Sequence, residues 1–176
     1  MFNNLKISKS QQINNIVVYF LKSHSQRRKN YLNLSKGLND NSIGINELEG
    51  TGYRDLLKVN NTSNENLLLV NGEQIIGHQV KQNRVVASTS LVQSNSEAIV
   101  YVSCGEKNRW SPSTNQEVKT ADTMFFSRNT LGDQNLLWSQ IDKQLDYYGI
   151  KSFTKDAAYV YDKNKFTVDK IVEEFK

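Results

Sequence analysis

The sequence of 176 residues has one cysteine, one proline and two histidines, and it has no long apolar run. The single thiol, Cys104, excludes a disulfide within the chain, and one thiol with two imidazoles does not complete a zinc site. No run approaches the roughly 18 apolar residues that cross a bilayer, and the first residues lack the apolar core of a signal peptide. We therefore expect a cytoplasmic protein with no metal, no cofactor and no membrane partner.

The chain also lacks the glycine-rich signatures of nucleotide-dependent enzymes, because neither a P-loop nor a dinucleotide fingerprint occurs. The formal net charge is +4. The densest basic cluster, Arg27 to Lys29, is too short to predict nucleic-acid binding, and a solvated basic turn is the simpler interpretation. We expect no nucleic-acid partner.

What is present is typical of a globular protein: 38% of the residues are hydrophobic and 23% are charged. The length suits a single domain over residues 1–176. Residues 1–12 are polar and without a clear pattern, so we expect them to form a mobile tail.

The centre of the sequence consists of short extended runs separated by polar turns. Leu56 to Val59 and Leu67 to Val70 predict two strands of one hairpin. Asn71-Gly72 predicts a tight reversal, followed by a returning strand up to Gly77. Further strands are expected at residues 16–21, 43–48, 84–92, 98–103 and 157–161. Most of the chain should therefore be antiparallel β-sheet.

One long helix is predicted from Asp133 to Tyr148, where Asp133 can cap the first turn and Gly149 can end the last. Its apolar residues fall on one face, as core packing requires. A short helical turn is expected near residues 33–38 and a short terminal helix at 168–175. The predicted class is α+β, a mainly antiparallel sandwich- or barrel-like sheet with one long helix in the C-terminal half.

Two polar clusters follow these strands. The first is Lys81-Gln82-Asn83-Arg84, whose cations can pair with phosphate while its amides recognise hydroxyl groups or a base edge. An exposed polar turn is the alternative.

The second cluster runs from Ser103 to Trp110. Glu106 and Arg109 can bind ribose hydroxyls or phosphate, and Trp110 can stack on a base. The alternative is structural: Cys104 as a small buried side chain, Glu106 and Arg109 as an internal ion pair, and Trp110 in the core.

Catalytic use of these residues would need Cys104 as a nucleophile, or Glu73 or Glu106 as a base. A thiolate needs a stabilising partner, and no motif ties either imidazole, His24 or His78, to Cys104. The catalytic set is incomplete, so we interpret the protein as a binder rather than an enzyme.

At these residues the chain resembles the ARPP-1 domain family, named for its association with ADP-ribosylglycohydrolases and rhodanese-phosphatases. The family has an LLLxxGExxxG stretch, matched by Leu67 to Glu73 with Gly77, and a KQNR segment, matched by Lys81 to Arg84. Its VSCxExxRW segment is matched by Val102 to Trp110, and a weaker similarity covers Gln134 to Tyr148. The resemblance implies a link to NAD-derived nucleotide metabolism or signalling.

The resemblance spans Leu32 to Val160, with two departures. His78 to Val80 form a small insertion, and Asn108 stands where many relatives have glycine. With the recognition residues, the resemblance predicts that the chain binds, and sequesters or senses, an ADP-ribose-type nucleotide, for instance an immune signal made from NAD. The alternative is an enzyme that hydrolyses or transfers such a nucleotide. A homo-oligomer stays open as a further partner.

The ligand-binding residues predicted in this way belong to both polar clusters: Lys81, Gln82, Asn83, Arg84, Glu106, Arg109 and Trp110. A single site requires the two clusters to converge on one side of the sheet.

Overall fold

The structure is a computed structural model, and it describes residues 5–23, 30–48, 55–76, 82–109, 119–121, 132–160 and Glu173. The chain divides into two compact units. The first comprises Met1–Asn30 with Asn164–Lys176, and the second comprises Tyr31–Lys163. Each unit is described by itself.

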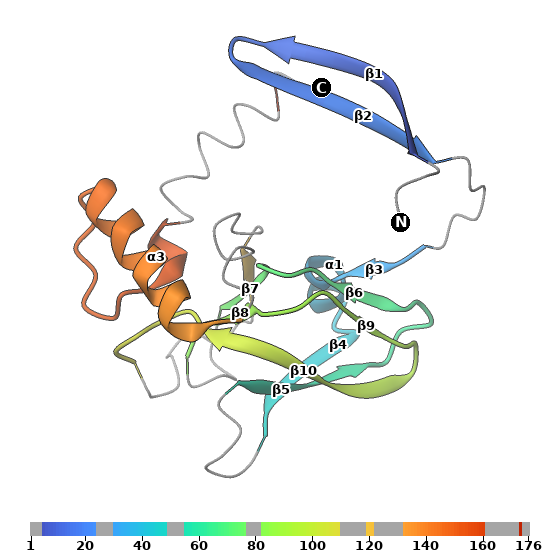
Figure 1. Cartoon of the computed structure of the whole chain (residues 1–176). Coiled ribbons are helices and arrows are strands. Elements are labelled where there is room, and N and C mark those ends of the chain that lie inside the picture. Colours follow the sequence, from blue (N-terminus) through green and yellow to red (C-terminus); the bar gives the residue numbers. More distant parts are fainter. Residues whose placement is uncertain are drawn as a thin grey trace. The chain divides into compact units, whose positions relative to one another are not determined.

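The described part of the first unit is mainly one antiparallel hairpin of β1 (Leu5–Ile13) and β2 (Ile16–Ser23) (Figure 1). Asn14 turns the chain with a φ of 52°, a conformation that asparagine tolerates better than most residues. Residues 5–12 were expected to be a tail, and they form most of β1 because all of them except Ser8, which lies at a register shift, pair with residues of β2.

The second unit contains a six-stranded sheet in the order β11-β7-β8-β10-β5-β4, in which every pairing is antiparallel. The strands are β4 (Ile43–Glu47), β5 (Leu56–Asn61), β7 (Gln74–Ile76), β8 (Arg84–Val86), β10 (Ser96–Cys104) and β11 (Lys119–Ala121). A three-stranded sheet in the order β3-β6-β9 completes the unit, built from β3 (Leu32–Asn33), β6 (Leu67–Leu69) and β9 (Ser90–Val92). Its β3-β6 pair is parallel.

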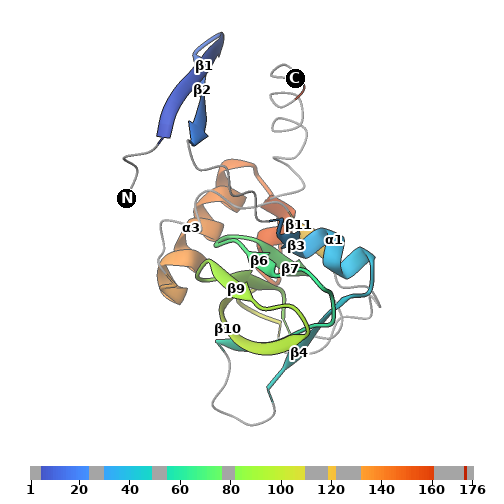
Figure 2. The ribbon, with the colours of Figure 1, turned by 90° about the vertical axis from the view of Figure 1, so that its right-hand side faces the viewer.

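These mainly antiparallel sheets curl into a half-barrel within the second unit (Figure 2). With the few helices, they confirm the predicted α+β class. The pairings predicted for β5, β6 and β7 were nevertheless wrong. β5 pairs with β4 and β10, whereas β6 pairs with β3 and β9, so the two do not form a hairpin.

The loop between β5 and β6 explains the difference. The side chain of Asn61 is fully buried, and its Nδ2 donates to the carbonyl oxygens of Glu65 at 2.9 Å and Gln93 at 3.0 Å. These bonds hold the loop against the turn before β10, so the chain enters the second sheet instead of folding back on β5.

The predicted reversal at Asn71 is confirmed: Glu73 N donates to Val70 O at 3.0 Å, and Gly72 has a φ of 93°. The strands on either side of this turn do not pair, because β7 lies between β8 and β11. The expected strand at 84–92 is likewise divided, with β8 in the six-stranded sheet and β9 in the other.

Helix α3 (Gln134–Tyr147) confirms the long helix. Asp133 caps it by accepting from the backbone of Asn135 and Leu136, and Gly149 follows its end with a φ of 62°. A short helix, α1 (Leu34–Asn39), confirms the expected helical turn, and Asn33 caps it. The terminal helix predicted at 168–175 lies outside the described residues apart from Glu173, which is helical.

Residues 157–160 are helical, so the strand predicted at 157–161 was wrong for these residues. The reason is local. The carboxylate of Asp156 accepts from the backbone of Ala158 at 2.9 Å, which caps a helical turn, and two alanines follow the cap.

Two apolar cores lie on opposite faces of the β8 and β10 strands. Val86 and Val102 belong to the larger core, between the two sheets. Val85, which alternates with Val86, packs with Leu137 and Ile141 of α3 in the smaller core. The smaller core fixes α3 over the same sheet face as Val85, called here the α3 face.

Among the residues that the structure describes, no helix is both long enough and apolar enough to cross a membrane.

Candidate functional site

The ends of β8 and β10 bring the two predicted polar clusters together. Cys104 pairs with Arg84 in the ladder, and one step further Gly105 N donates to Asn83 O at 2.7 Å. A Cβ atom on Gly105 would lie 3.1 Å from that carbonyl oxygen, so glycine permits the close approach of the two segments.

Four side chains meet beside this contact, and we call them the Asn83 cluster: Asn83, Glu106, Arg109 and Asp156. Glu106 Oε2 accepts from the backbone of Asn83 at 2.8 Å and from Arg109 Nε at 2.8 Å. The Nη2 of Arg109 also pairs with Glu106. The side chain of Asn83 accepts from Arg109 at 3.2 Å and donates to Asp156 at 3.0 Å.

The cluster is buried except at one point. The side chain of Glu106 is 4% exposed, whereas that of Arg109 is 17% exposed. Asn83 and Asp156 are also buried. Arg109 is therefore the member through which the cluster reaches solvent.

Gln82 lies beside the cluster and is fully buried. Its Nε2 donates to the backbone oxygen of Arg109. Its Oε1 has no hydrogen-bond partner among the described residues. A buried carbonyl oxygen in this condition is uncommon in native proteins, so it indicates a group that a ligand or a water molecule can satisfy.

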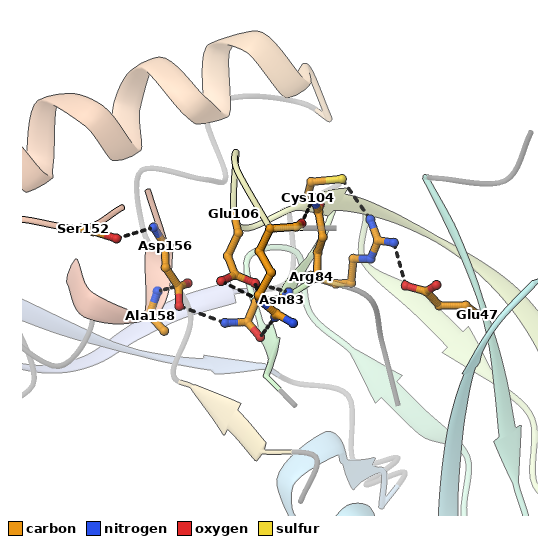
Figure 3. Close-up of polar contacts among 10 residues, drawn as sticks. Glu47, Asn83, Arg84, Cys104, Glu106, Ser152, Asp156 and Ala158 are labelled. Atoms are coloured by element: carbon orange, nitrogen blue, oxygen red, sulfur yellow. Dashed lines mark hydrogen bonds and ion pairs between the residues drawn. The ribbon is translucent and has the colours of Figure 1, made fainter. Parts of the chain in front are cut away.

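The segment that carries Asp156 is fixed to the end of β10 by backbone bonds. Lys107 N donates to Thr154 O at 2.9 Å, and Ala157 N donates to Gly105 O at 2.9 Å. The backbone of Asp156 itself donates to Ser152 Oγ at 3.2 Å (Figure 3). Asp156 is thus held in place from both sides.

Burial raises the pKa of Asp156 from 3.8 to about 6, because a charged carboxylate loses its hydration there. The backbone bond from Ala158 opposes this rise and lowers the pKa, whereas the negative charge of Glu106 adds to the rise. The hydrogen bond from Asn83 and the positive charge of Arg109 also lower the pKa. Asp156 therefore changes its charge at about pH 6 instead of in the usual acidic range of a carboxyl group.

A second set of contacts, called here the Arg84 cluster, comprises Glu47, Arg84 and Cys104. Arg84 Nη2 pairs with Glu47 Oε1 at 2.8 Å, and its Nη1 donates to Cys104 Sγ at 2.9 Å. Arg84 and Cys104 are buried, and the side chain of Glu47 is 18% exposed.

The two clusters lie on opposite faces of the sheet. Arg84 pairs with Cys104 on the face of the larger core, and successive residues of an extended chain point to opposite sides. Asn83 precedes Arg84 and so shares the α3 face with Val85. Figure 3 shows Asn83 and Glu106 directed toward Asp156, while Arg84 is directed toward Glu47.

The structure therefore brings together Gln82, Asn83, Glu106 and Arg109 of the predicted binding residues. It places Arg84 in the other cluster. Lys81 and Trp110 lie outside the described residues.

The three residues considered for catalysis all have structural contacts. Glu73 Oε2 accepts from the backbone of Val70 at 2.8 Å and stabilises the turn at Asn71. Cys104 is 5% exposed and lies against Arg84, and Glu106 pairs with Arg109. Both histidines lie outside the described residues, and no group of metal-ligating side chains is found within the described part of the chain.

Sequence reasoning missed Asp156 and Glu47. Both are far from the two motifs in sequence, and only the fold brings them near. A signal for Asp156 was present: Asp156 precedes Ala157-Ala158, a pattern typical of a helix cap.

It also missed how α3 holds the end of β10. Gln134 Nε2 donates to Cys104 O at 2.9 Å, and Cys104 N donates to Gln134 Oε1 at 2.6 Å. The indole of Trp138 donates to the same carbonyl oxygen at 3.1 Å. The helix thereby fixes the backbone from which Glu106 and Arg109 follow.

The chain matches no curated protein and no solved structure. A family model does match it, over residues 4–176, and this range is wider than the similarity expected from the motifs. The KQNR and VSCxExxRW motifs agree with this match over nearly the whole length. The chain belongs to the ARPP-1 family, the ARG and Rhodanese-Phosphatase-superfamily-associated Protein domain.

Proposed function

We propose that the Asn83 cluster binds an ADP-ribose-type nucleotide and releases it unchanged. The observation that carries this proposal is the meeting of Asn83, Glu106 and Arg109 on the α3 face, with Gln82 bonded to the backbone of Arg109 beside them. These residues come from two separate sequence motifs, and together they offer a cation, a carboxylate and two amides.

Each group suits one part of such a ligand. Arg109 carries the solvent-facing positive charge of the cluster and can pair with a pyrophosphate oxygen. Glu106 can accept a hydrogen bond from a ribose hydroxyl, and the amide of Asn83 can donate one. Lys81 and Trp110 remain predictions from the sequence, for the pyrophosphate and for stacking on a base. The proposal assigns Arg84 no ligand contact.

The family supports the ligand class. Its name records an association with ARG, the ADP-ribosylglycohydrolases, and with the rhodanese-phosphatase superfamily, which is an ADP-ribose-related context. A protein that binds such a nucleotide without converting it can act as a sensor, or can sequester an immune signal made from NAD.

Calorimetric titration of ADP-ribose, cyclic ADP-ribose isomers and NAD into the full chain tests the proposal. We expect saturable heat with at least one of these ligands. Absence of heat with all of them would refute ligand binding of this class.

One observation favours a second function, an enzyme that hydrolyses an ADP-ribose-like substrate. Asp156, with its pKa raised to about 6, lies beside the carboxylate of Glu106, and a carboxyl group of this kind suits general acid-base catalysis. Incubation with the ligand, denaturation and chromatography separate the two functions. Recovery of intact ligand supports binding, and a changed ligand supports catalysis.

A further inference from the structure

Gln74, at the start of β7, is a buried glutamine whose amide has no partner in the described part of the chain. It is 1% exposed, and neither its Oε1 nor its Nε2 has a hydrogen-bond partner among the described residues. A buried amide in this state lowers the stability of the folded chain, because water satisfies both atoms in the unfolded chain. Such a residue in a native protein needs an explanation.

A second glutamine of the same unit shows the ordinary arrangement. Both amide atoms of Gln134 bond to the backbone of Cys104, one as donor and one as acceptor. Gln134 therefore has a structural role that Gln74 lacks, and it serves as a matched comparison.

Gln74 lies on the same side of the sheet as the Asn83 cluster. It is directly opposite Val85 in the β7-β8 ladder, and paired residues share a face. Asn83 directly precedes β8 and lies two positions before Val85, so in the continued extended chain it is a diagonal neighbour of Gln74. Diagonal neighbours on one face are about 7–8 Å apart, a distance that a single nucleotide spans.

The free amide defines the chemistry of the group that it can bind. A carboxamide presents one acceptor and one donor side by side in one plane. Adenine presents the complementary pair, its exocyclic amino group and a neighbouring ring nitrogen, and glutamine makes this bidentate contact in protein–nucleic acid complexes. Ribose or phosphate alone does not offer this pair in a fixed plane.

We infer that Gln74 recognises the adenine base of the nucleotide bound at the Asn83 cluster. The inference rests on the proposed function, and it adds that binding is selective for adenine. The amide, which has no partner among the residues that the structure describes, gains both hydrogen bonds when the base enters.

The test uses two ligands and two variants of the full chain. The ligands are ADP-ribose and its analogue in which hydrogen replaces the adenine amino group. This analogue is smaller and lacks only the donor. The variants are Gln74→Leu and, as the control, Gln134→Leu. Affinities are measured by calorimetry, and thermal midpoints are measured without ligand.

We expect the wild-type protein to bind ADP-ribose about tenfold or more tightly than the analogue, which is the discrimination that a bidentate base contact provides. Gln74→Leu should bind both ligands with the same affinity. Its midpoint without ligand should be equal to or above that of the wild type. Gln134→Leu should lower the midpoint, because it removes the acceptor of Cys104 N and one of the two side-chain donors to Cys104 O.

The remaining outcomes separate this inference from the proposed function. Equal wild-type affinities for both ligands, or undiminished preference in Gln74→Leu, would overturn the inference and leave nucleotide binding intact. A midpoint for Gln74→Leu as low as that for Gln134→Leu would also overturn it. The wild type could bind AMP but not ADP-ribose, and it could prefer AMP to the AMP analogue in which hydrogen replaces the amino group. If Gln74→Leu abolishes that preference, the inference stands and the proposed function fails. No binding of either nucleotide would overturn both.

Discussion

Asn83 and Arg84 are adjacent in one motif, yet they belong to two different clusters on opposite faces of the sheet. The Asn83 cluster combines two carboxylates, one guanidinium and an amide beside α3. The Arg84 cluster places its guanidinium between Glu47 and Cys104 on the face of the larger core. The comparison teaches that adjacent residues of one polar motif can belong to different sites, one in the proposed binding site and the next in a structural cluster on the other face.

The largest effect should come from breaking the buried pair of the Asn83 cluster. Glu106→Gln removes the charge that faces Arg109 and weakens the acceptor of Asn83 N, so we expect the free energy of unfolding to fall by about 4 kcal/mol. Urea denaturation measures it. The control is Glu97→Gln, which disrupts the exposed pair with Lys58 and should cost about 0.5 kcal/mol. Equal losses in both variants would contradict the burial of the Asn83 cluster.

The second effect is the pH dependence that Asp156 confers on stability. Its pKa is about 6 in the folded protein, against an ordinary value of 3.8 for an aspartic acid side chain. The folded state therefore binds the proton more tightly, and its contribution to stability is fully present below pH 3.8 and is lost as the pH rises through 6. The total change is about 3 kcal/mol.

Asp156→Asn removes this titration. The unfolding free energy of the wild type, minus that of the variant, should therefore decrease between pH 4 and pH 7. An increase over this range would show that the carboxylate is stabilised in its charged form and would contradict its desolvation.

A smaller loss is expected from the Arg84 cluster. In Arg84→Met, the carboxylate of Glu47, which is 18% exposed, can turn toward water, and Cys104 keeps its packing. We expect the unfolding free energy to fall by about 2 kcal/mol. The loss should be smaller than for Glu106→Gln, because Glu106 also accepts from the backbone of Asn83. Nucleotide affinity should be unchanged, and a selective loss of affinity without a loss of stability would place Arg84 in the binding site.

The smallest effect should come from Cys104. Cys104→Ala removes one buried sulfur atom and should reduce the unfolding free energy by about 1 kcal/mol. Binding, and the chemical state of the recovered ligand, should be the same as for the wild type. If the wild type converts its ligand and the variant does not, Cys104 is a nucleophile and the structural role of the Arg84 cluster is refuted.

The sequence predicted the features that depend on local chemistry. Asp133 and Gly149 fixed the ends of α3, and Asn71-Gly72 fixed a reversal. It did not predict the partners of β6. That strand joins the three-stranded sheet through contacts between residues far apart in sequence, such as the bond from Asn61 to Gln93. Asp156 was missed for the same reason, since backbone bonds between residues 105–108 and the segment that carries it bring it near Asn83.

The separation of the two clusters was nevertheless implicit in the sequence. If Asn83 and Arg84 are both extended, their side chains must point to opposite sides. The similar residue types of the KQNR motif suggest one recognition set, but the alternation of an extended chain divides Asn83 and Arg84 between two faces.

The most direct measurement of the central claim compares two matched substitutions in one calorimetric titration with ADP-ribose. Arg109→Lys and Arg84→Lys each keep the positive charge and remove the planar guanidinium. Binding at the Asn83 cluster predicts about tenfold weaker affinity for Arg109→Lys and wild-type affinity for Arg84→Lys. Equal loss in both variants, or loss in Arg84→Lys alone, would contradict the assignment of ligand binding to the α3 face.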